Sequence, residues 1–268
     1  MKLKTIFSKN FIKKYFLQVF LPYVVSFATR RKTFKVKYGG EEVILNSIIF
    51  DKDIMYHHFH AHYRAKDNFS KDEWEKKSVD LARDATLFLD IGGYNGIFGI
   101  LASKMNKNIK VHIFEPNPLS AYIIYTNMEL NKVNNVFLHQ AAVGDVNGLV
   151  PVKIQKNGSR VDFTIKNNFI MQPCLTIDSL ISCLNQEDFE KVVVKIDAEG
   201  FEKQCLEGMR EFIKRCKFLD ILLTIHSEII NPVHGYTVED FYELLKKLEL
   251  KKIDSEDFRT GIELHVKK

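Results

Sequence analysis

The chain has 268 residues, of which 46% are hydrophobic and 12% aromatic, so it can bury a sizeable core and is not grossly disordered. Its formal net charge is +5, yet the first 40 residues hold ten Lys and Arg side chains and no acid. Taking those ten charges from +5 leaves −5 for residues 41–268, which argues against a nucleic-acid-binding groove on the main domain.

The cysteines show no spacing that is typical of a metal site or a redox pair. No CxxC pair occurs, and no histidine lies at metal-ligand spacing from any of them. In a chain of this length we expect small, buried apolar residues in a reducing compartment, so the sequence predicts a cytoplasmic protein. The four are Cys174, Cys183, Cys205 and Cys216.

Residues 1–33 form a basic and apolar N-terminal segment, with the run YFLQVFLPYVVSFA at residues 15–28. The run is too short to span a bilayer, which takes about 18 or more apolar residues. Its layout resembles a signal peptide, but no small-x-small cleavage site follows. Two interpretations remain open: a helix packed on protein, or peripheral contact of residues 1–32 with an anionic inner membrane face.

Residues 34–85 are expected to form an extension on the substrate side or in a homo-oligomer interface. Their first part predicts a hairpin that turns at Gly39-Gly40. A histidine cluster follows, without a carboxylate at a recognisable ligand spacing, so we interpret it as a polar strand or loop rather than a metal site. The cluster consists of His57, His58, His60 and His62.

From residue 86 onward, strand-like and helix-like runs alternate, which predicts a mostly parallel sheet covered on both faces by helices. The predicted strands are Thr86–Ile91, Lys110–Phe114, Val136–Ala142, Val192–Ile196 and Phe218–Ile225. The predicted helices are Asn95–Met105, Pro118–Asn131, Phe201–Arg215 and Val238–Leu248. An insertion at residues 149–184 carries two short alternating runs, and the C-terminal residues predict a closing pair of strands. Residues 86–268 are therefore expected to form one α/β domain.

A glycine-rich turn, FLDIGGYNGIFGI, follows the first predicted strand. Its glycines do not fit the dinucleotide fingerprint, and Asp90 precedes them in the pattern Asp-x-Gly-x-x-x-Gly. A carboxylate in this turn would repel a phosphate, but it suits the ammonium and sulfonium charges of S-adenosylmethionine (SAM). Glu115 ends the second predicted strand, where an acid can accept both ribose hydroxyls. Together the two acids predict a SAM site.

Five segments resemble, in the same order, those of FkbM-type methyltransferases, a family of class I SAM-dependent methyltransferases. They lie between residues 86 and 226 and read FLDIGGYNGIFGI, IFEPNPLSAYIIYTNMELN, QAAVGD, LTIDSL and VVKIDAEGFEKQCLEGM. The resemblance implies a Rossmann-like α/β fold with a mostly parallel seven-stranded sheet, helices on both faces and an N-terminal extension. It also implies SAM as the cofactor, without an expected metal ion.

Carried over by position, the resemblance implies that Asp90, Gly92 and Gly96 line the methionine end of SAM and that Glu115 binds the ribose. Further cofactor contacts are expected from Gly93, Tyr94, Asn95, Pro116, Asn117, Gln140, Ala141 and Asp197. The family turn commonly has asparagine where Tyr94 stands, so we expect an altered cofactor contact there. A family glutamate in the fifth strand is replaced here by Thr224, with His226 two positions on.

The candidate catalytic groups are Asp197, Glu199 and His226, at the ends of the fourth and fifth predicted strands. Asp197 and Glu199 occupy alternate positions and so point to the same side. His226 is the preferred base for an alcohol acceptor, because an unperturbed imidazole has a pKa near neutrality. Asp197 would hold the acceptor or the cofactor, with Glu199 in support.

Other interpretations of these three residues stay open. Glu199 can be an acid favoured at a helix start, and His226 an ordinary strand-end histidine. A divalent ion held by all three side chains is a further alternative.

We therefore expect a SAM-dependent O-methyltransferase that acts on a sugar hydroxyl of a nucleotide-sugar or cell-surface glycan. The motifs indicate the cofactor, whereas family tendency alone indicates the acceptor. One alternative is a class I methyltransferase acting on an amine, a lipid or a small natural product. Another is a SAM-binding assembly protein that has lost catalysis.

Overall fold

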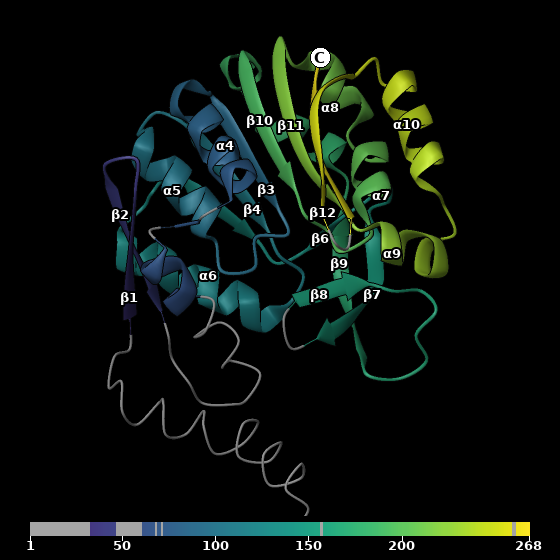
Figure 1. Cartoon of the computed structure of the whole chain (residues 1–268), viewed down its shortest axis with the longest axis horizontal. Helices are drawn as coiled ribbons and strands as arrows, with labels where there is room; N and C mark the ends of the chain where they lie inside the picture. Colours follow the sequence, from purple (N-terminus) through teal and green to yellow (C-terminus); the bar gives the residue numbers. More distant parts are fainter. Residues whose placement is uncertain (1–32, 47–60, 68, 71, 156–157, 259–260) are drawn as a thin grey trace, which may run out of the picture.

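The structure is a computed structural model, and it describes residues 33–46, 61–67, 69–70, 72–155, 158–258 and 261–268 (Figure 1). The membrane contact expected through residues 1–32, and His57, His58 and His60, lie outside the described residues. His62 is described: it is helical and exposed, so the expected strand or loop is wrong at this position. Within the described ranges, no helix has the length and apolarity needed to cross a bilayer.

A seven-stranded sheet forms the centre of the molecule, in the order β12-β13-β11-β10-β3-β4-β5 (Figure 1). All its strands run parallel except β13, which is antiparallel to both β11 and β12. This confirms the predicted sheet and its closing pair of strands. The strands are β3 (Leu87–Ile91), β4 (Lys110–Phe114), β5 (Val136–His139), β10 (Lys191–Ile196), β11 (Phe218–Ile225), β12 (Lys251–Phe258) and β13 (Gly261–Lys267).

Helices cover both faces of this sheet (Figure 1). One layer holds α4 (Glu73–Leu81), α5 (Ile97–Met105) and α6 (Pro118–Asn131), whose apolar side chains pack with Phe88 and Val193. The other layer holds α7 (Glu202–Glu207), α8 (Arg210–Arg215) and α10 (Val238–Lys247), which pack with Leu87, Leu89 and Val194. Neighbouring residues of β3 and β10 thus face opposite layers, which is why these strands read as unbroken apolar runs.

The predicted helix over residues 201–215 is wrong in its continuity, because it is interrupted between α7 and α8. A Cβ on Gly208 would overlap the carbonyl oxygen of Gly144, so the backbones meet there. Asp178 then caps the start of α8, since its carboxylate accepts from the N–H groups of Glu211, at 3.2 Å, and Phe212, at 2.7 Å. Tertiary contact therefore overrides the helical pattern of this stretch.

The insertion forms a second sheet of four strands, in the order β6-β9-β7-β8. Its strands are β6 (Ala142–Val143), β7 (Gly148–Gln155), β8 (Gly158–Val161) and β9 (Phe169–Leu175). The predicted strand Val136–Ala142 is split, because the chain leaves the central sheet after His139 and Ala142 pairs with Cys174 of β9. Two 3-10 helices, η4 (Ile177–Cys183) and η5 (Gln186–Phe189), lead back to the central sheet.

The predicted N-terminal hairpin is confirmed as β1 (Thr33–Tyr38) and β2 (Glu41–Asn46), which turn at Gly39-Gly40. Both glycines have a positive φ, 59° and 89°, which glycine adopts without strain. The hairpin packs on α5 and α6 through apolar side chains, and the amide of Asn46 donates to Asn127 Oδ1 at 2.6 Å. It lies behind the helical layer and borders neither cavity described below.

Candidate active site

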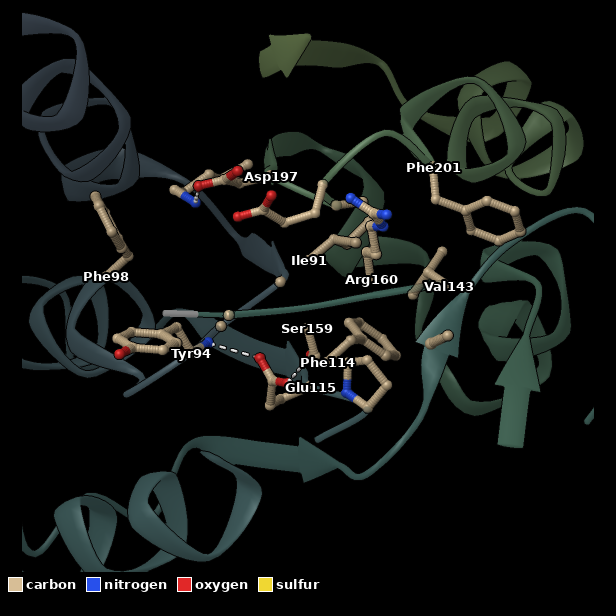
Figure 2. A pocket seen from close by; sticks show the side chains of 18 of the residues that line it. Ile91, Tyr94, Phe98, Phe114, Glu115, Val143, Ser159, Arg160, Asp197 and Phe201 are labelled. Carbon is tan, nitrogen blue, oxygen red and sulfur yellow. Dashed lines mark hydrogen bonds and ion pairs between the residues drawn. The ribbon is translucent and has the colours of Figure 1, made fainter. Parts of the chain in front are cut away.

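A cavity of about 480 Å³ opens at the carboxyl ends of β3, β4 and β10 (Figure 2). Pockets of this size commonly hold a small-molecule ligand. The second sheet contributes one wall, through β6 and the β8 residues Gly158 to Val161. The cavity brings together these predicted site residues: Gly92, Gly93, Tyr94, Asn95, Glu115, Pro116, Ala141, Asp197 and Glu199.

The glycine turn owes its shape to two positions with left-handed backbone. Gly92 has φ +83°, and a Cβ there would overlap the carbonyl oxygen of Asp197, so only glycine lets the ends of β3 and β10 meet. Tyr94 has φ +52°, a conformation that asparagine tolerates better than most residues. The next residue, Asn95, lies just before Gly96, the N-cap of α5, and its Oδ1 accepts from the amide of Ile97, the first residue of the helix, at 3.2 Å.

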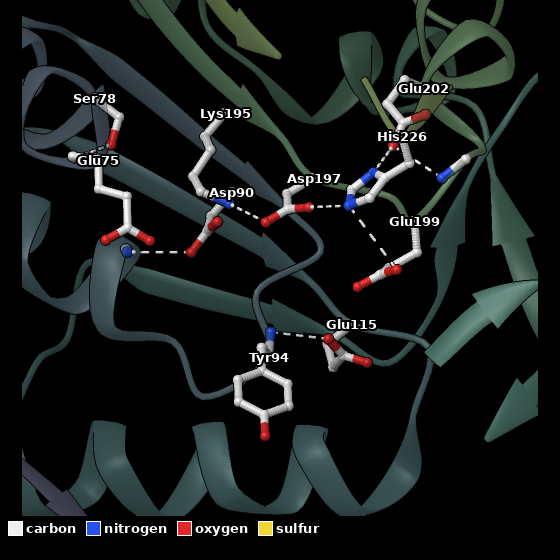
Figure 3. Close-up of polar contacts among 12 residues, drawn as sticks. Glu75, Ser78, Asp90, Tyr94, Glu115, Lys195, Asp197, Glu199, Glu202 and His226 are labelled. Atoms are coloured by element: carbon white, nitrogen blue, oxygen red, sulfur yellow. Dashed lines mark hydrogen bonds and ion pairs between the residues drawn. The ribbon is translucent and has the colours of Figure 1, made fainter. Parts of the chain in front are cut away.

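Glu115 fastens this turn to the end of β4 (Figure 3). It is buried, and its Oε2 accepts from the amide of Tyr94 at 2.8 Å while Oε1 accepts from the amide of Asn117 at 2.8 Å. The hydroxyl of Ser159, from β8, lies 3.4 Å from Oε1. Burial raises the pKa of Glu115 to about 7, although these hydrogen bonds favour the charged form.

Asp90 lies beneath the turn and is not among the residues that line the cavity. It shares the face of β3 that carries Phe88, so its side chain points toward α5, where Oδ2 accepts from the amide of Gly99 at 3.2 Å. Oδ1 has no hydrogen-bond partner in the described part of the chain. Burial raises the pKa of Asp90, and the nearby charge of Lys195 opposes that shift.

Three more predicted cofactor residues are not among those that line the cavity. Gly96 is the N-cap of α5, and Asn117 is the N-cap of α6, where its Oδ1 accepts from the amide of Leu119 at 3.0 Å. Gln140 is exposed, and its amide donates to Gln172 at 3.3 Å. The structure therefore gives Gly96 and Asn117 a part in building the site.

A second cavity, of about 300 Å³, adjoins the first and shares Glu75, Lys195, Asp197 and Glu199 with it. It lies between α4 and the ends of β10, β11 and β13. The remaining lining residues are Asp72, Trp74, Ser78, Leu222, Thr224, His226 and Glu263.

The three predicted catalytic residues meet where the two cavities join (Figure 3). His226 Nε2 lies 3.7 Å from Asp197 Oδ1 and 3.9 Å from Glu199 Oε2. Lys195 Nζ lies 3.5 Å from Asp197 Oδ2 on the opposite side. Glu199 has a left-handed φ of +50°, a strained conformation that is often found at functional sites.

His226 does not have the near-neutral pKa on which its expected role as base depended. Burial lowers the pKa of this imidazole, but a hydrogen bond to Glu202 and the charges of Asp197, Glu202 and Glu199 outweigh burial and raise the pKa to about 9. At pH 7 the ring is therefore an imidazolium and has no free lone pair for a proton. The premise taken from an isolated histidine is wrong here, because three carboxylates surround the ring.

The two carboxylates facing His226 differ in protonation behaviour. Burial opposes ionisation of Asp197, but the charges of Lys195 and His226 hold its pKa below the ordinary value. Burial raises the pKa of Glu199, although His226 opposes the shift. Glu199 is thus the more basic of the two carboxylates, and it lines both cavities.

Several residues of the site escaped the sequence interpretation. Lys195 is a buried cation in an otherwise apolar strand, with Nζ 4.6 Å from the centre of the Phe98 ring, and a lysine inside VVVKI was a signal for it. Arg64 and Glu75 form an ion pair at the edge of the first cavity. Glu202 contacts His226 from α7. No spacing rule pairs residues so far apart in sequence.

Metal-ligating side chains do not gather into a metal site in the described part of the chain. Among those residues, no group of three His, Cys, Asp or Glu side chains has an arrangement that could hold an ion. The alternative of a divalent ion shared by Asp197, Glu199 and His226 therefore finds no ligand set there. The described cysteines form no disulfide. Cys174, Cys205 and Cys216 are buried as expected, but Cys183 is exposed, so the expectation is wrong there.

A comparison with family profiles identifies the chain. The profile of the methyltransferase FkbM domain matches residues 90–256, which include the glycine turn, Glu115 and the KIDAEG segment. The chain belongs to the FkbM methyltransferase family. It is therefore a SAM-dependent methyltransferase, and the turn, the acid at the end of β4 and the adjoining cavity fit that cofactor.

Solved structures of similar fold include several methyltransferases. An O-methyltransferase from Bacillus cereus in complex with SAH is 16% identical, with a TM-score of 0.46, covering 74% of this chain and 82% of that one. Precorrin-6y C5,15-methyltransferase from Geobacter metallireducens GS-15 is 13% identical, with a TM-score of 0.44, covering 74% and 88%. M. jannaschii TYW2 in complex with AdoMet is 15% identical, with a TM-score of 0.41, covering 88% and 85%. No curated protein is similar enough in sequence to count as a relative.

Proposed function

We propose that this FkbM-family protein is an O-methyltransferase that methylates a sugar hydroxyl of a nucleotide-sugar or cell-surface glycan. The observation that supports this proposal is the pair of adjoining cavities, which share Asp197 and Glu199. The first cavity is lined by the glycine turn and by Glu115, the acid proposed to bind the ribose, and the second is lined by polar side chains that can contact an acceptor. A methyl donor and an acceptor can thus meet at a carboxylate.

The first cavity has suitable groups along the whole length of SAM. Glu115 accepts the ribose hydroxyls, Pro116 and Ala141 provide apolar contact for the adenine, and Asp197 faces the positively charged methionine end. SAM supplies a methyl group on a sulfonium, which an acceptor displaces in line. The negative charges of Asp197 and Glu199 stabilise a cationic ligand, and they disfavour a dinucleotide.

The second cavity suits a hydroxyl-bearing ring. Ser78, Thr224 and Glu263 provide polar atoms around it, and Trp74 provides apolar contact for a sugar. Alignment of the acceptor oxygen with the methyl carbon supplies much of the rate of such a displacement.

Glu199 is the group that takes the acceptor's proton in this proposal. The acceptor hydroxyl gives its proton to a carboxylate oxygen of Glu199, its oxygen bonds to the methyl carbon, and the sulfur keeps the electron pair of the broken bond. A raised pKa improves a carboxylate as a base, and partial burial raises the pKa of Glu199. Asp197, with its lowered pKa, stays ionised beside Lys195.

Two measurements test the proposed function. Isothermal titration calorimetry of the protein with SAM is expected to show binding to one site. Incubation with methyl-labelled SAM and fractionated nucleotide-sugars, followed by mass spectrometry, is expected to yield an acid-stable methyl ether on a sugar. Absence of SAM binding would overturn the cofactor assignment, and label only on nitrogen or carbon would overturn O-methylation.

An amine acceptor is the second candidate, because the second cavity is acidic. Its lining holds five carboxyl groups against two cations, Lys195 and His226. Such a charge balance attracts a positively charged acceptor. Polyamines and amino sugars in the same labelling assay decide between the two, and a rate unchanged by Glu199→Gln, which removes the proposed base, would favour an amine. The carboxyl groups are Asp72, Glu75, Asp197, Glu199 and Glu263.

A further inference from the structure

Glu202 is a buried carboxylate to which the proposed reaction assigns no part. It is the first residue of α7 and is fully buried. Its Oε1 accepts from the amide of Gly200 at 2.9 Å and lies 2.9 Å from His226 Nδ1. Its Oε2 has no hydrogen-bond partner within the described residues. A buried carboxylate is costly unless charge or hydrogen bonds compensate it, so its position needs an explanation.

One oxygen of Glu202 connects two elements of the site (Figure 3). Gly200 follows Glu199 in the turn after β10, and both have left-handed φ values, +50° for Glu199 and +100° for Gly200. The turn is held from its other side by the hydroxyl of Tyr236, which donates to the carbonyl of Gly200 at 2.9 Å. Glu202 thus fixes the backbone beside Glu199 and the imidazole at the end of β11 at the same time.

The contact with Glu202 also determines how His226 is oriented. Because Nδ1 is engaged by Glu202, the other ring nitrogen faces the junction of the cavities, 3.7 Å from Asp197 Oδ1 and 3.9 Å from Glu199 Oε2. Carboxylates therefore face both edges of the ring, an environment that suits a doubly protonated imidazolium.

Other charged groups near the ring do not reverse this balance. Across the second cavity lie Asp72, which is the N-cap of α4, Glu75 on α4 and Glu263 on β13. These add negative charge, and Lys195 on β10 adds positive charge. His234 lies beyond Glu202, and burial lowers the pKa of its ring. The carboxylates outnumber the cations, which favours the charged ring.

We propose that Glu202 is a positioning residue that holds His226 through Nδ1 as an imidazolium, so that His226 orients Asp197 and Glu199 and leaves Glu199 to take the acceptor's proton. This inference rests on the proposed O-methyltransferase function for its last step. The orientation of His226 by Glu202 stands on the geometry of the site alone. His226 is then a fixed cation, and its charge attracts the two carboxylates that lie 3.7 and 3.9 Å from Nε2.

NMR tests the charge of His226 without any acceptor. In histidine-labelled protein, the His226 signal, assigned with a His226→Gln variant, is expected to titrate near pH 9. In Glu202→Gln, which keeps the size of the side chain, the midpoint is expected to fall by more than about one pH unit, since a neutral amide replaces the carboxylate. Glu228→Gln is the matched control, because Glu228 is exposed and close in sequence to His226.

Two results of that titration would overturn the proposal. One is a wild-type midpoint near 6.5, and the other is an unchanged midpoint in Glu202→Gln. Calorimetry with SAM accompanies each variant, because retained SAM affinity shows that Glu202→Gln is folded.

Rates of methyl transfer to the labelled nucleotide-sugar fraction separate the two roles of His226. If His226 is a fixed cation, Glu202→Gln lowers kcat at pH 7.5 about tenfold or more, and moves the alkaline loss of activity to lower pH. If His226 is the base, the same variant raises kcat at pH 7.5, because more of the ring is deprotonated, and the proposal fails.

A second variant tests the proposal without a change at the buried Glu202. The side chain of Glu199 is partly exposed. Glu199→Gln is expected to lower kcat about 100-fold, which is the effect expected for the loss of a general base. A smaller loss in Glu199→Gln than in His226→Gln would contradict the proposal. Absence of transfer by the wild type would overturn the proposed function, and the NMR titration would still decide the role of Glu202.

Discussion

Asp90 and Lys195 lie opposite each other in register on β3 and β10, and this pairing changes the role of Asp90. The sequence indicated an acid next to a glycine turn, and the acid is there. However, the alternation of side chains along β3 directs Asp90 toward α5 and Lys195, so it supports the turn from beneath. Glu115, at the very end of β4, does line the cavity. Asp90 lies within β3, whereas Glu115 directly follows β4, and this difference in position decides which of the two acids reaches the cavity.

Gly92→Ala is expected to destabilise the protein and abolish SAM binding. The added Cβ would overlap the carbonyl oxygen of Asp197, and alanine is strained at a φ of +83°. We expect a loss of about 2–4 kcal/mol in the free energy of unfolding, measured by urea denaturation. Gly148→Ala is the control, since the space around its Cβ is open, and it is expected to stay within about 1 kcal/mol of wild type.

The raised pKa of Glu115 predicts that the stability of the fold depends on pH. Its pKa is about 7 in the folded protein against 4.5 for the ordinary side chain, so between these values the folded state holds a proton that the unfolded state has lost. The free energy of unfolding therefore falls as pH rises through this window, by up to about 3 kcal/mol from this group.

Urea denaturation at pH 5 and pH 8 measures this contribution of Glu115. Glu115→Gln is expected to lose that part of the pH dependence, whereas Glu228→Gln keeps the wild-type slope. An identical slope in Glu115→Gln would contradict the raised pKa.

At the scale of elements, periodicity located the strands and helices well, and it failed where one element contacts another. The bounds of β4, α6 and β11 agree with the sequence prediction. The two errors after residue 86, the split strand after His139 and the interrupted helix at Gly208, both lie where the chain meets the second sheet. Local patterns report which residues are apolar, and they do not report which sheet or backbone those residues will contact.

Asp178→Ala tests the interruption between α7 and α8. The carboxylate of Asp178 accepts from the amides of Glu211 and Phe212, so its loss leaves two N–H groups of α8 without that partner. We expect a decrease of about 1 kcal/mol in the free energy of unfolding, measured by thermal and urea denaturation. Asp257→Ala, at an exposed position of β12, is the control and is expected to be near neutral. An equal effect of both changes would rule out the capping role.

At the scale of the whole molecule, segments from three parts of the chain enclose the site. Residues 61–81 contribute Tyr63, Arg64 and Glu75, the second sheet contributes Ser159, and the central sheet contributes the strand ends. Of the extension before residue 86, the β1–β2 hairpin borders neither cavity, whereas the part around α4 borders both. The substrate-side role expected for residues 34–85 thus becomes a proposal for the part near α4.

Hydrogen exchange with and without S-adenosylhomocysteine tests this enclosure. Amides of residues 158–161 and 63–64 are expected to exchange more slowly with ligand, by up to about 100-fold at a ligand concentration 100 times Kd. Residues 33–46 serve as the internal control, because the hairpin is remote from both cavities. Equal protection of the hairpin and of residues 158–161 would contradict a site closed by the second sheet.

Local sequence was sufficient for the features that depend on short-range chemistry. The alternation of apolar runs predicted the parallel sheet, and the turn after Thr86–Ile91 with Glu115 predicted the cofactor. The family followed from the resemblance of five segments, which include KIDAEG. Tertiary structure alone decided which groups share the reaction centre and how they are charged. Asp197, Glu199, Glu202 and His226 come from β10, α7 and the end of β11, and the pKa of His226 depends on their mutual distances. Electrostatic energies depend on separation in space and on burial, and neither can be counted along the chain.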